Sequence, residues 1–443
     1  MKRKVLLTAF VSLFLAISLT LSVGILIAGP SQAGANEILS SPPQLRDKDG
    51  NWNKNYLADF TDYISDRFYL RQELITLDNY LTAQVFQTSG NEKVLLGKDG
   101  WLFFAETLDS FAGTGALSQR ELFSMAKNLQ LMQSYCEAQG KQFAFMVAPN
   151  KNSVYPEQMG DFGMRSELSD AARLTQLLKD MDVNTVDLLG ALQQQEEKLY
   201  FAHDSHWNSK GAALGADLIN AAFGVKSGYF LGDFSQTAPH TGDLYEMVYP
   251  ALKDAETNLV YGGQLEFSYT SKLTKPDSII LQTAGNGEGK LLAYRDSFGN
   301  LLYPYLSDTY AESYFARSTT YDLTKEADFV LVELVERNLS YLLANVPVIQ
   351  SPMAEITLPQ TSSGAASVTL SLKDKAPEGC VRVKGALPLA PDDDSCVYLV
   401  CGGQAYEAFL MENDGFAVYV PENGDIQSLA YTVGGQLVMY EIT

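Results

Sequence analysis

Short apolar runs that alternate with helical patterns are the feature that most constrains the fold of this 443-residue chain. Residues 143–147 are continuously apolar, which is typical of a strand buried on both faces of a parallel sheet. Similar runs predict strands at residues 183–189, 291–294 and 329–332. Because helical patterns separate these runs, we predict a three-layer α/β domain built around a parallel sheet.

Start and stop signals define the predicted helices. Ser118 followed by Glu121 forms a capping box, and Gly140 is the expected end of the helix that this box opens. Further helices are predicted at residues 57–87, 168–181 and 209–223. A hairpin is expected around Lys98-Asp99-Gly100, and residues 229–290 are expected to form short strands and loops.

The pattern changes near the C-terminus. After about residue 355, apolar and polar residues alternate along the chain, and no helical pattern appears. Asn413-Asp414-Gly415 and Gly434-Gly435 are typical hairpin turns. Residues 355–443 are therefore predicted to form a small antiparallel β-sandwich, after an α/β domain at residues 91–350.

The N-terminus carries a long apolar run. Residues 5–29 contain no charged side chain and follow the basic segment Met1-Lys2-Arg3-Lys4. A membrane span needs about 20 apolar residues, whereas the core of a signal peptide has about 7–15, so the run favours an uncleaved anchor. Ala33-Gly34-Ala35 is an acceptable cleavage site, which leaves secretion as the alternative. Either reading makes 1–35 an anchor or signal peptide, 36–90 a linker with a helical segment, and the rest extracytoplasmic.

Charge and cysteine content limit the partners. The formal net charge is −21, so the surface repels nucleic acid and anionic headgroups. No Cys-x-x-Cys spacing occurs, and no metal or other cofactor is predicted. Cys136 stands alone, while a disulfide among Cys380, Cys396 and Cys401 is possible.

Asp204-Ser205-His206-Trp207 contains an acid and an imidazole two residues apart. In a loop that leads into a helix, the carboxylate can accept from the Nδ1–H of His206 and leave Nε2 free to take a proton. The alternative is that Asp204 caps the helix while His206 and Trp207 pack in the core. A metal site made of His203, Asp204 and His206 is a minor option, because a third well-spaced partner is missing.

Ser297 follows the apolar run at 291–294, and the residues after it can begin a helix. A turn from strand to helix lifts a side chain to the carboxyl edge of a parallel sheet, where such folds place ligands. The N–H groups at the helix start can stabilise an oxyanion there. The alternative role for Asp296 or Ser297 is simple helix capping. Together, a hydroxyl, an imidazole and an acid are the parts of a nucleophilic hydrolase or acyltransferase.

Several ordered motifs resemble the DHHW family and the related alginate O-acetylation proteins. The resemblance covers roughly residues 56–340 and includes Asp204-Ser205-His206-Trp207-Asn208 with Gly211-Ala212 after it. The other motifs that carry it are Asp66-Arg67-Phe68, Gly97-Lys98-Asp99-Gly100-Trp101-Leu102-Phe103, Pro149-Asn150-Lys151, Val154-Tyr155-Pro156-Glu157 and Asp296-Ser297-Phe298. It implies an SGNH-hydrolase-like domain in permuted order, with the Asp-x-His loop before the serine.

The resemblance also implies roles for particular residues. Ser297 would be the nucleophile, His206 the general base and Asp204 its orienting acid. Possible oxyanion or substrate contacts are Tyr303, Asn150, Lys151 and Phe298. Asn150 and Lys151 are expected more to satisfy loop backbone than to touch substrate. Arg295 departs from the small residue that relatives carry before the Asp-Ser pair, and Arg337 is expected to form a structural ion pair.

The implied function is an extracytoplasmic serine O-acyltransferase or esterase that acts on a cell-surface or secreted polysaccharide or cell-wall glycan. Relatives work with a membrane-bound acyltransferase, so the resemblance implies such a partner as acyl donor. The alternative is a non-catalytic scaffold in the cell envelope that binds glycan through exposed aromatics of the C-terminal region. Tyr398, Tyr406 and Tyr419 are the tyrosines considered for that role.

Overall fold

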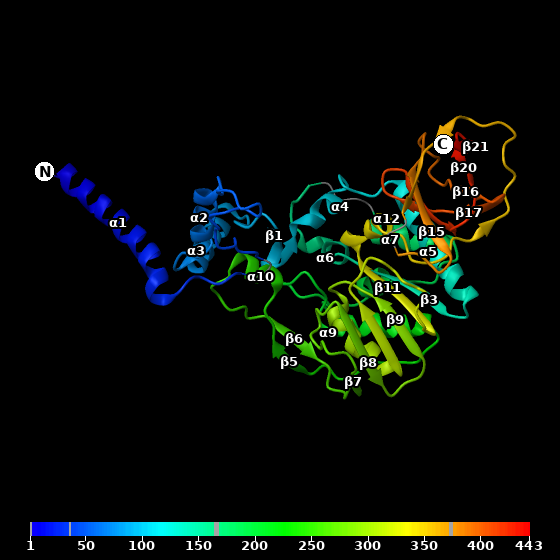
Figure 1. The fold of residues 1–443 in the computed structure, drawn as a ribbon. Coiled ribbons are helices and arrows are strands. Elements are labelled where there is room, and N and C mark those ends of the chain that lie inside the picture. Colours follow the sequence, from blue (N-terminus) through cyan, green and yellow to red (C-terminus); the bar gives the residue numbers. More distant parts are fainter. Residues whose placement is uncertain (1, 35–36, 164–167, 372–374) are drawn as a thin grey trace.

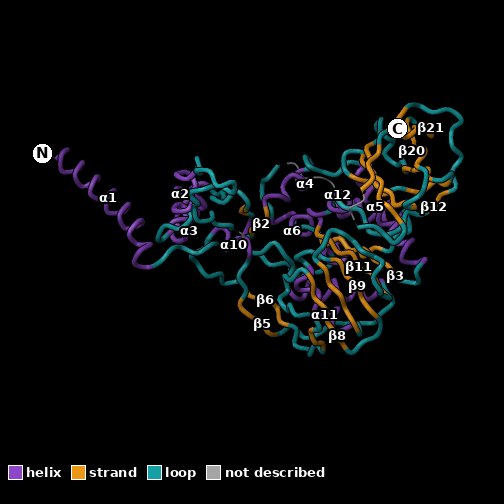
Figure 2. Tube along the Cα trace, in the orientation of Figure 1, coloured by secondary structure: helices purple, strands orange, loops and turns teal. Residues whose placement is uncertain are grey.

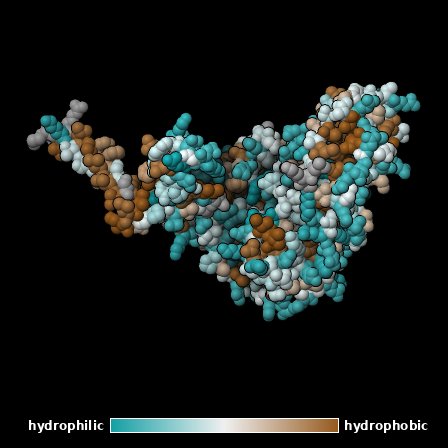
Figure 3. All heavy atoms as spheres, in the orientation of Figure 1, coloured by the Kyte–Doolittle hydropathy of each residue, from teal (hydrophilic) through white to brown (hydrophobic). Residues whose placement is uncertain are grey.

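The computed structural model describes residues 2–34, 37–163, 168–371 and 375–443 and shows four successive parts (Figure 1). Helix α1 (Lys2–Ala28) projects from the rest of the protein, and its stretch Lys4–Ala28 is long and apolar enough to cross a membrane. A pair of helices follows it, then the α/β domain, then a C-terminal region of strands (Figure 2). Most of the visible surface of α1 is hydrophobic (Figure 3).

The predicted single helix at 57–87 is wrong, because the chain breaks between α2 (Tyr56–Ser65) and α3 (Arg71–Phe86). Leu70 adopts a left-handed conformation with φ 63°, which no α-helix can continue through. The apolar spacing runs on across the break, so periodicity alone could not reveal it.

The main sheet confirms the predicted α/β class. Its strand order is β4-β3-β11-β9-β10-β8-β7, and neighbours from β4 to β10 run parallel, whereas β8 and β7 pair antiparallel. The sheet is therefore mixed and mainly parallel. Its strands are β3 (Gln142–Ala148), β4 (Thr185–Val186), β7 (Phe267–Tyr269), β8 (Ile280–Gly285), β9 (Lys290–Tyr294), β10 (Glu312–Ala316) and β11 (Phe329–Val335).

Helices cover both faces of this sheet. Phe143, Phe145 and Val147 of β3 point to a core shared with α5 (Gln119–Ala138), α7 (Asp170–Asp180) and α12 (Tyr341–Ala344). Ala144 and Met146 point to the opposite core, shared with α8 (Leu188–Gln193), α9 (Ser209–Ala222) and α11 (Gly299–Thr309). Alternate side chains of one strand thus serve opposite layers, which explains why the run at 143–147 is apolar throughout.

Local signals were accurate at some helix ends and misleading elsewhere. The Ser118–Glu121 capping box is present, and Gly140 has φ 71° just beyond α5. The strand predicted at 183–189 is wrong in length: only Thr185–Val186 pairs, because the Asp187 side chain accepts from Gly190 N at 3.0 Å and starts α8. The sequence did not reveal β10.

Small elements complete the region around the main sheet. Strands β1 (Val94–Leu96) and β2 (Leu102–Phe104) form the predicted hairpin, with a 3₁₀ turn at Lys98–Gly100. The segment at 229–290 contains β5 (Gln236–Pro239), α10 (Asp243–Val248) and β6 (Thr257–Val260) besides β7 and β8. Other short helices are Ala105–Thr107, α4 (Leu108–Ala112), α6 (Lys151–Val154), Pro156–Gln158 and Glu336–Asn338.

The C-terminal region has separate β-sheets, in the orders β12-β17-β16-β20-β21-β13 and β14-β15-β19-β18, with an apolar cluster between them. Asn128 of α5 fixes this region to the α/β domain by bonding both the N–H and the carbonyl of Leu410. The strands are β12 (Met353–Ala354), β13 (Ala365–Ala366), β14 (Val368–Ser371), β15 (Cys380–Ala386), β16 (Val397–Cys401), β17 (Gln404–Glu407), β18 (Phe409–Met411), β19 (Gly415–Pro421), β20 (Ile426–Val433) and β21 (Gln436–Ile442).

Two expectations about this region are corrected. Tyr406 and Tyr419 are buried and Tyr398 is half-buried, so these tyrosines do not form an exposed sugar-stacking surface. Tyr406 lies in the apolar cluster between the two C-terminal sheets, and Tyr419 lies in the cluster shared with α5 of the α/β domain. Cys380, Cys396 and Cys401 are all free thiols, so the possible disulfide is absent among these described residues.

Candidate active site

The turn after β9 holds Ser297 at the carboxyl edge of the sheet. Asp296 clamps this turn: its Oδ1 accepts from Phe298 N at 3.0 Å, and its Oδ2 accepts from Val335 N at 2.7 Å and Asn338 Nδ2 at 3.1 Å. Among the described residues, no side chain caps α11, whose N-cap residue is Phe298, so the alternative capping role is wrong for both Asp296 and Ser297; Asp296 instead ties the turn to the end of β11. The Ser297 hydroxyl does not cap the helix and stays available for other contacts.

Arg295 is accommodated because its side chain lies along the start of α11. Its guanidinium donates to Asn300 Oδ1 at 2.6 Å and to the Pro276 carbonyl at 2.5 Å. A Cβ at Gly299 would collide with the Arg295 side chain, so glycine is required there. Burial lowers the pKa of Arg295 to about 10, against the attraction of buried Glu333. A large residue before the Asp-Ser pair thus leaves the turn intact.

His206 lies between Ser297 and Asp204. Its Nε2 is 2.8 Å from Ser297 Oγ, and its Nδ1 is 2.7 Å from Asp204 Oδ1. The ring packs against Phe298, with 4.7 Å between ring centroids, and Phe298 also meets the buried Trp207 edge-on at 4.9 Å. The structure therefore brings the three predicted triad residues together, and Phe298 and Trp207 support the imidazole.

Asp204 is buried among donors. His240 Nε2 lies 3.0 Å from its Oδ2, and Asp243 N donates to the same oxygen at 3.1 Å. The backbone N–H of His206 donates to Oδ1 at 2.9 Å. Burial opposes ionisation of Asp204, but the hydrogen bonds from His206 and His240 outweigh it and hold its pKa well below the usual range. Asp204 is thus an anion oriented through both oxygens.

Asp243 adds a second carboxylate beside the same loop. It accepts from Ser205 N and Ser205 Oγ, both at 2.7 Å, and its Oδ2 is 3.7 Å from His206 Nδ1. Burial and the charge of Asp204 raise the pKa of Asp243. Sequence reasoning missed both Asp243 and His240, because they come from the irregular segment at 229–290 and share no local spacing with Asp204.

Lys151 supports the loop at residues 201–206 by donating to its backbone carbonyls. Its buried Nζ donates to the carbonyls of Phe201 at 3.1 Å, Ala202 at 3.0 Å and Asp204 at 2.6 Å. Burial lowers its pKa to about 7, against the attraction of nearby Asp204. Lys151 therefore satisfies loop carbonyls, as expected from the sequence. Its Nζ points to the loop.

The other predicted contacts lie farther from the hydroxyl–imidazole pair. Tyr303 is buried, its hydroxyl lies 2.6 Å from that of Tyr269, and burial raises its pKa. Asn150 is buried at the end of β3, where its N–H donates to Glu336 Oε2 at 2.9 Å. Within the described residues, neither side chain bonds Ser297 or His206. Any contact of Tyr303 or Asn150 with substrate stays a prediction.

Arg337 does not form the expected ion pair in the part of the chain that the structure describes. Its guanidinium instead lies over the rings of Phe104, at 5.4 Å, and Phe298, at 5.5 Å. Cation–π contacts suit a guanidinium that covers an apolar wall. Glu336 and Asp296, near the end of β11, accept from backbone N–H groups instead of pairing with Arg337.

Clusters of possible metal ligands are present, but they differ from the set considered from the sequence. Asp204, His206 and Asp243 form one cluster, and His203, Asp254 and Glu256 form another. In the second, Glu256 accepts from Ala202 N at 2.6 Å and His203 N at 3.0 Å. Hydrogen bonds within the protein thus already use these carboxylates.

The chain is similar to known polysaccharide acetylation proteins. Residues 94–264 match the SGNH hydrolase-like domain family of the acetyltransferase AlgX, a range that includes Asp204 and His206 and ends before Ser297. The probable alginate O-acetylase AlgJ of Pseudomonas syringae pv. tomato is 31% identical over 208 residues, which is 44% of this chain and 50% of that protein. Its counterpart in Pseudomonas aeruginosa is 26% identical over 170 residues, 35% of this chain and 41% of that protein.

The chain thus matches half or less of the length of these curated relatives. Among solved structures, a DHHW family protein from Eubacterium siraeum is 18% identical with a TM-score of 0.42, covering 57% of this chain and 95% of that one. The predicted resemblance to the alginate O-acetylation proteins is confirmed by the match of residues 94–264 to the SGNH hydrolase-like domain of that acetyltransferase family.

Proposed function

We propose that this protein is an extracytoplasmic serine O-acyltransferase or esterase that acts on a cell-surface or secreted polysaccharide. The observation that carries the proposal is the hydrogen-bonded series from Asp204 through His206 to Ser297 at the carboxyl edge of the sheet. An imidazole held by a carboxylate on one nitrogen and facing a hydroxyl with the other is the arrangement that activates serine.

In the proposed mechanism, Ser297 Oγ attacks the carbonyl carbon of an acyl ester while His206 Nε2 takes the hydroxyl proton. The tetrahedral intermediate then collapses, the bond to the leaving alkoxide breaks, and His206 returns the proton to that oxygen. This leaves an acyl group on Ser297. A sugar hydroxyl or water then loses its proton to His206, attacks the acyl carbon and releases Ser297, which regains the proton.

Backbone groups around Ser297 can stabilise the oxyanion. The N–H groups of Ser297 and Gly299 have no hydrogen-bond partner within the described residues; Gly299 is the first residue of α11, and Ser297 lies two residues before it. A helix start concentrates positive partial charge, which favours an anion there. Asp204 complements this by stabilising the imidazolium that forms when His206 takes the proton.

The similarity to proteins named as probable alginate O-acetylases supports a polysaccharide acceptor and an acetyl group. Acyl-CoA is not expected outside the cytoplasm, so a transferase there needs another acyl donor, and we propose a membrane-bound acyltransferase partner. Helix α1 would anchor the chain beside it, with cleavage and secretion as the alternative. Exclusion of water from the acyl-enzyme decides between transfer and hydrolysis.

Hydrolysis of a small acetyl ester tests the proposal. We expect Ser297→Ala to lose turnover by at least about 1,000-fold while unfolding at the wild-type temperature, because only the nucleophile is removed. Ser363→Ala is the matched control, since Ser363 is exposed in the linker before the C-terminal strands. Unchanged turnover in Ser297→Ala would sink the proposed function. Transfer of the acetyl group to an added polysaccharide would distinguish a transferase from an esterase.

A further inference from the structure

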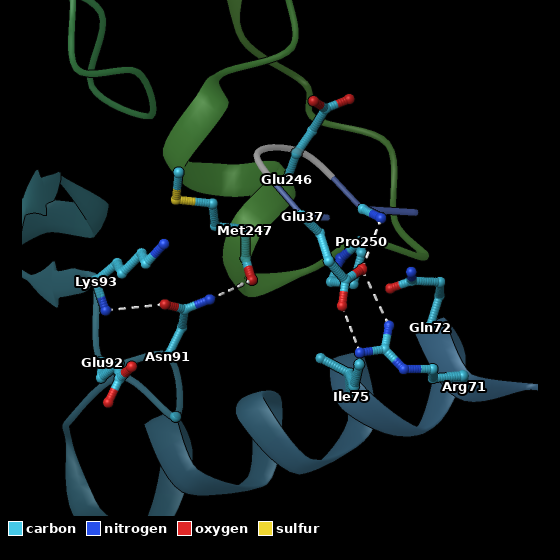
Figure 4. Close-up of a pocket in the computed structure, with 12 residues that line it drawn as sticks. Glu37, Arg71, Gln72, Ile75, Asn91, Glu92, Lys93, Glu246, Met247 and Pro250 are labelled. Carbon is cyan, nitrogen blue, oxygen red and sulfur yellow. Dashed lines mark hydrogen bonds and ion pairs between the residues drawn. The ribbon is translucent and has the colours of Figure 1, made fainter. Parts of the chain in front are cut away.

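The inner face of α3 packs on the α/β domain through polar contacts. Asn79 Nδ2 donates to the Val248 carbonyl at 2.7 Å, and Thr76 Oγ1 accepts from Ala251 N at 3.0 Å. Beside these contacts lies a hollow of about 340 Å³ lined by α3, residues 90–93 and α10, in which Arg71 pairs with Glu37 (Figure 4). The face of α3 toward the protein is therefore polar and already engaged.

The opposite face of α3 is apolar and exposed. Leu74, Leu77, Leu81 and Val85 are 40%, 53%, 52% and 67% exposed. Their spacings of three, four and four residues place them on one side of a helix that turns by about 100° per residue. The same geometry puts that side roughly opposite Thr76 and Asn79. We call these four residues the outer stripe. A soluble helix would turn such a stripe toward the core, and this one is turned away.

The outer stripe begins next to the C-terminal end of α1. Tyr69, just before α3, donates its N–H to the Leu21 carbonyl at 3.2 Å and packs so closely on Gly24 that a Cβ there would collide with its ring. Gly24 lies about 6 Å along the helix axis from the last residue of α1, at 1.5 Å per residue. Helices α2 and α3 lie between α1 and the α/β domain (Figure 1). The face of α3 away from the domain is thus on the side of α1.

We propose that the outer stripe lies in the interfacial layer of the same bilayer that α1 crosses, so that α3 is a second, in-plane membrane contact. The proposal rests on α1 being an uncleaved anchor, as in the proposed function. A helix with one apolar face lies at this depth when that face is buried among the acyl chains. The corner at Tyr69 holds the start of α3 at the level of residues 21–24, about one to two turns before the end of α1.

Charge indicates which kind of lipid contact this is. The stripe itself carries no charge, Glu73 and Asp78 lie close to it on α3, and the chain has a net charge of −21. Attraction to anionic headgroups is therefore excluded as the driving force, and burial of apolar surface remains. The contact should form on neutral phosphatidylcholine and resist salt. Because α10 begins at Asp243, which bonds Asp204, the contact would also set the height of the active site above the bilayer.

Depth-dependent fluorescence of full-length protein in phosphatidylcholine vesicles tests the stripe. An environment-sensitive dye is attached to Leu77→Cys or Leu81→Cys, and to Leu389→Cys as the control, because Leu389 is 54% exposed in the C-terminal region. Cys396, the one native cysteine among the described residues that is not buried, is replaced by serine in every variant. We expect lipid-borne quenchers to reduce emission at 77 and 81 several-fold more than at 389, equally at low and high salt.

The outcomes distinguish failure of the outer-stripe contact from failure of α1 as a membrane anchor. Emission at 77 and 81 that lipid quenchers affect no more than at 389, in a chain that resists carbonate extraction, would overturn the stripe contact alone. A chain that carbonate releases would overturn the anchor on which the contact depends, while esterase activity reports on the active site separately. Shielding seen only in native membranes, and not in pure lipid, would replace the lipid surface with a protein partner and overturn the proposal.

Discussion

His203 and His206 occupy the same loop, and both pair with a carboxylate through Nδ1. The distance is 2.8 Å from His203 to Asp254 and 2.7 Å from His206 to Asp204, and the side chains are 28% and 22% exposed. The two histidines differ in the contact that Nε2, the other ring nitrogen, makes. Nε2 of His206 faces Ser297 Oγ, whereas Nε2 of His203 has no partner among the described residues, and that ring stacks on Tyr245. An acid–imidazole pair alone therefore does not distinguish the two histidines; the hydroxyl that the turn after β9 places beside His206 does.

The carboxylates also serve different purposes. Asp204 accepts from both His206 and His240, so it orients an imidazole on either side. Asp254 accepts from Gly242 N at 3.1 Å and Glu256 N at 3.0 Å besides His203. The pair of His203 and Asp254 thus fastens the loop to the segment after α10, while the pair of His206 and Asp204 places an imidazole nitrogen against the Ser297 hydroxyl.

The largest contrast is expected between the histidines themselves. His206→Ala removes the base and should lower kcat/KM for acetyl-ester hydrolysis on the order of 10⁴-fold or more. His203→Ala should change it by less than about threefold and cost about 1 to 2 kcal/mol of folding stability, because the hydrogen bond to Asp254 and the stacking on Tyr245 are lost. Parallel rate and unfolding measurements check both. Equal losses of activity in the two variants would break the distinction.

The acids should show the same contrast at a smaller scale. We expect Asp204→Asn to reduce kcat by about 10²- to 10⁴-fold, since an amide can hold the wrong tautomer of His206 and cannot stabilise its imidazolium. Asp254→Asn should leave kcat near the wild-type value. Saturation kinetics on the same ester measure both. A wild-type kcat in Asp204→Asn would remove Asp204 from the mechanism.

His240 tests whether the second oxygen of Asp204 matters. His240→Phe keeps a ring stacked on Phe201, where the centroids are now 3.7 Å apart, but removes the donor to Asp204. We expect a drop in kcat on the order of tenfold, the lower range for loss of a group that orients a functional residue. His240→Gln can restore a donor and should recover part of the rate. No difference between the variants would show that His240 only packs.

The smallest expected difference between Asp204 and Asp254 is in how much each stabilises the fold against acid. Burial opposes ionisation of Asp254, but His203 and the Gly242 N–H outweigh it and lower its pKa, while that of Asp204 is held well below the usual range. Both groups take up protons more readily in the unfolded chain. Their stabilisation is therefore present above the unfolded value of about 4 and is lost as pH falls below it. Between pH 5 and about 2, the free energy of unfolding should depend less on pH in each Asn variant than in the wild type, and the reduction should be larger for Asp204→Asn. Denaturant unfolding at a series of pH values measures it.

Sequence patterns predicted what depends on neighbouring residues. The apolar run at 143–147 and the capping box at Ser118 are local signals, and the α/β class followed from their order along the chain. The break at Leu70 was invisible, because the apolar spacing continues through it. Strand β10 was missed because Glu312, Ser313 and Tyr314 interrupt its apolar pattern.

For the candidate site, order along the chain and resemblance pointed to Ser297, His206 and Asp204. The structure brings them together, and their roles in catalysis remain our proposal. His240 and Asp243 could not be predicted, because only the tertiary path of the segment at 229–290 carries them to Asp204. The role of Lys151 could be predicted, because a charged residue that follows a buried strand is expected to satisfy loop backbone. Its Nζ bonds the carbonyls of the neighbouring loop.

The most direct test of the account is to trap the acyl group on the enzyme. Full-length protein is mixed with an acetyl ester, stopped with acid, digested and analysed by mass spectrometry. We predict one added acetyl group on the peptide that contains Ser297 in wild type and in His203→Ala, and none on that peptide in Ser297→Ala or early in the reaction of His206→Ala. Acetylation at another residue with Ser297 unmodified, or equal trapping in His206→Ala, would contradict the account.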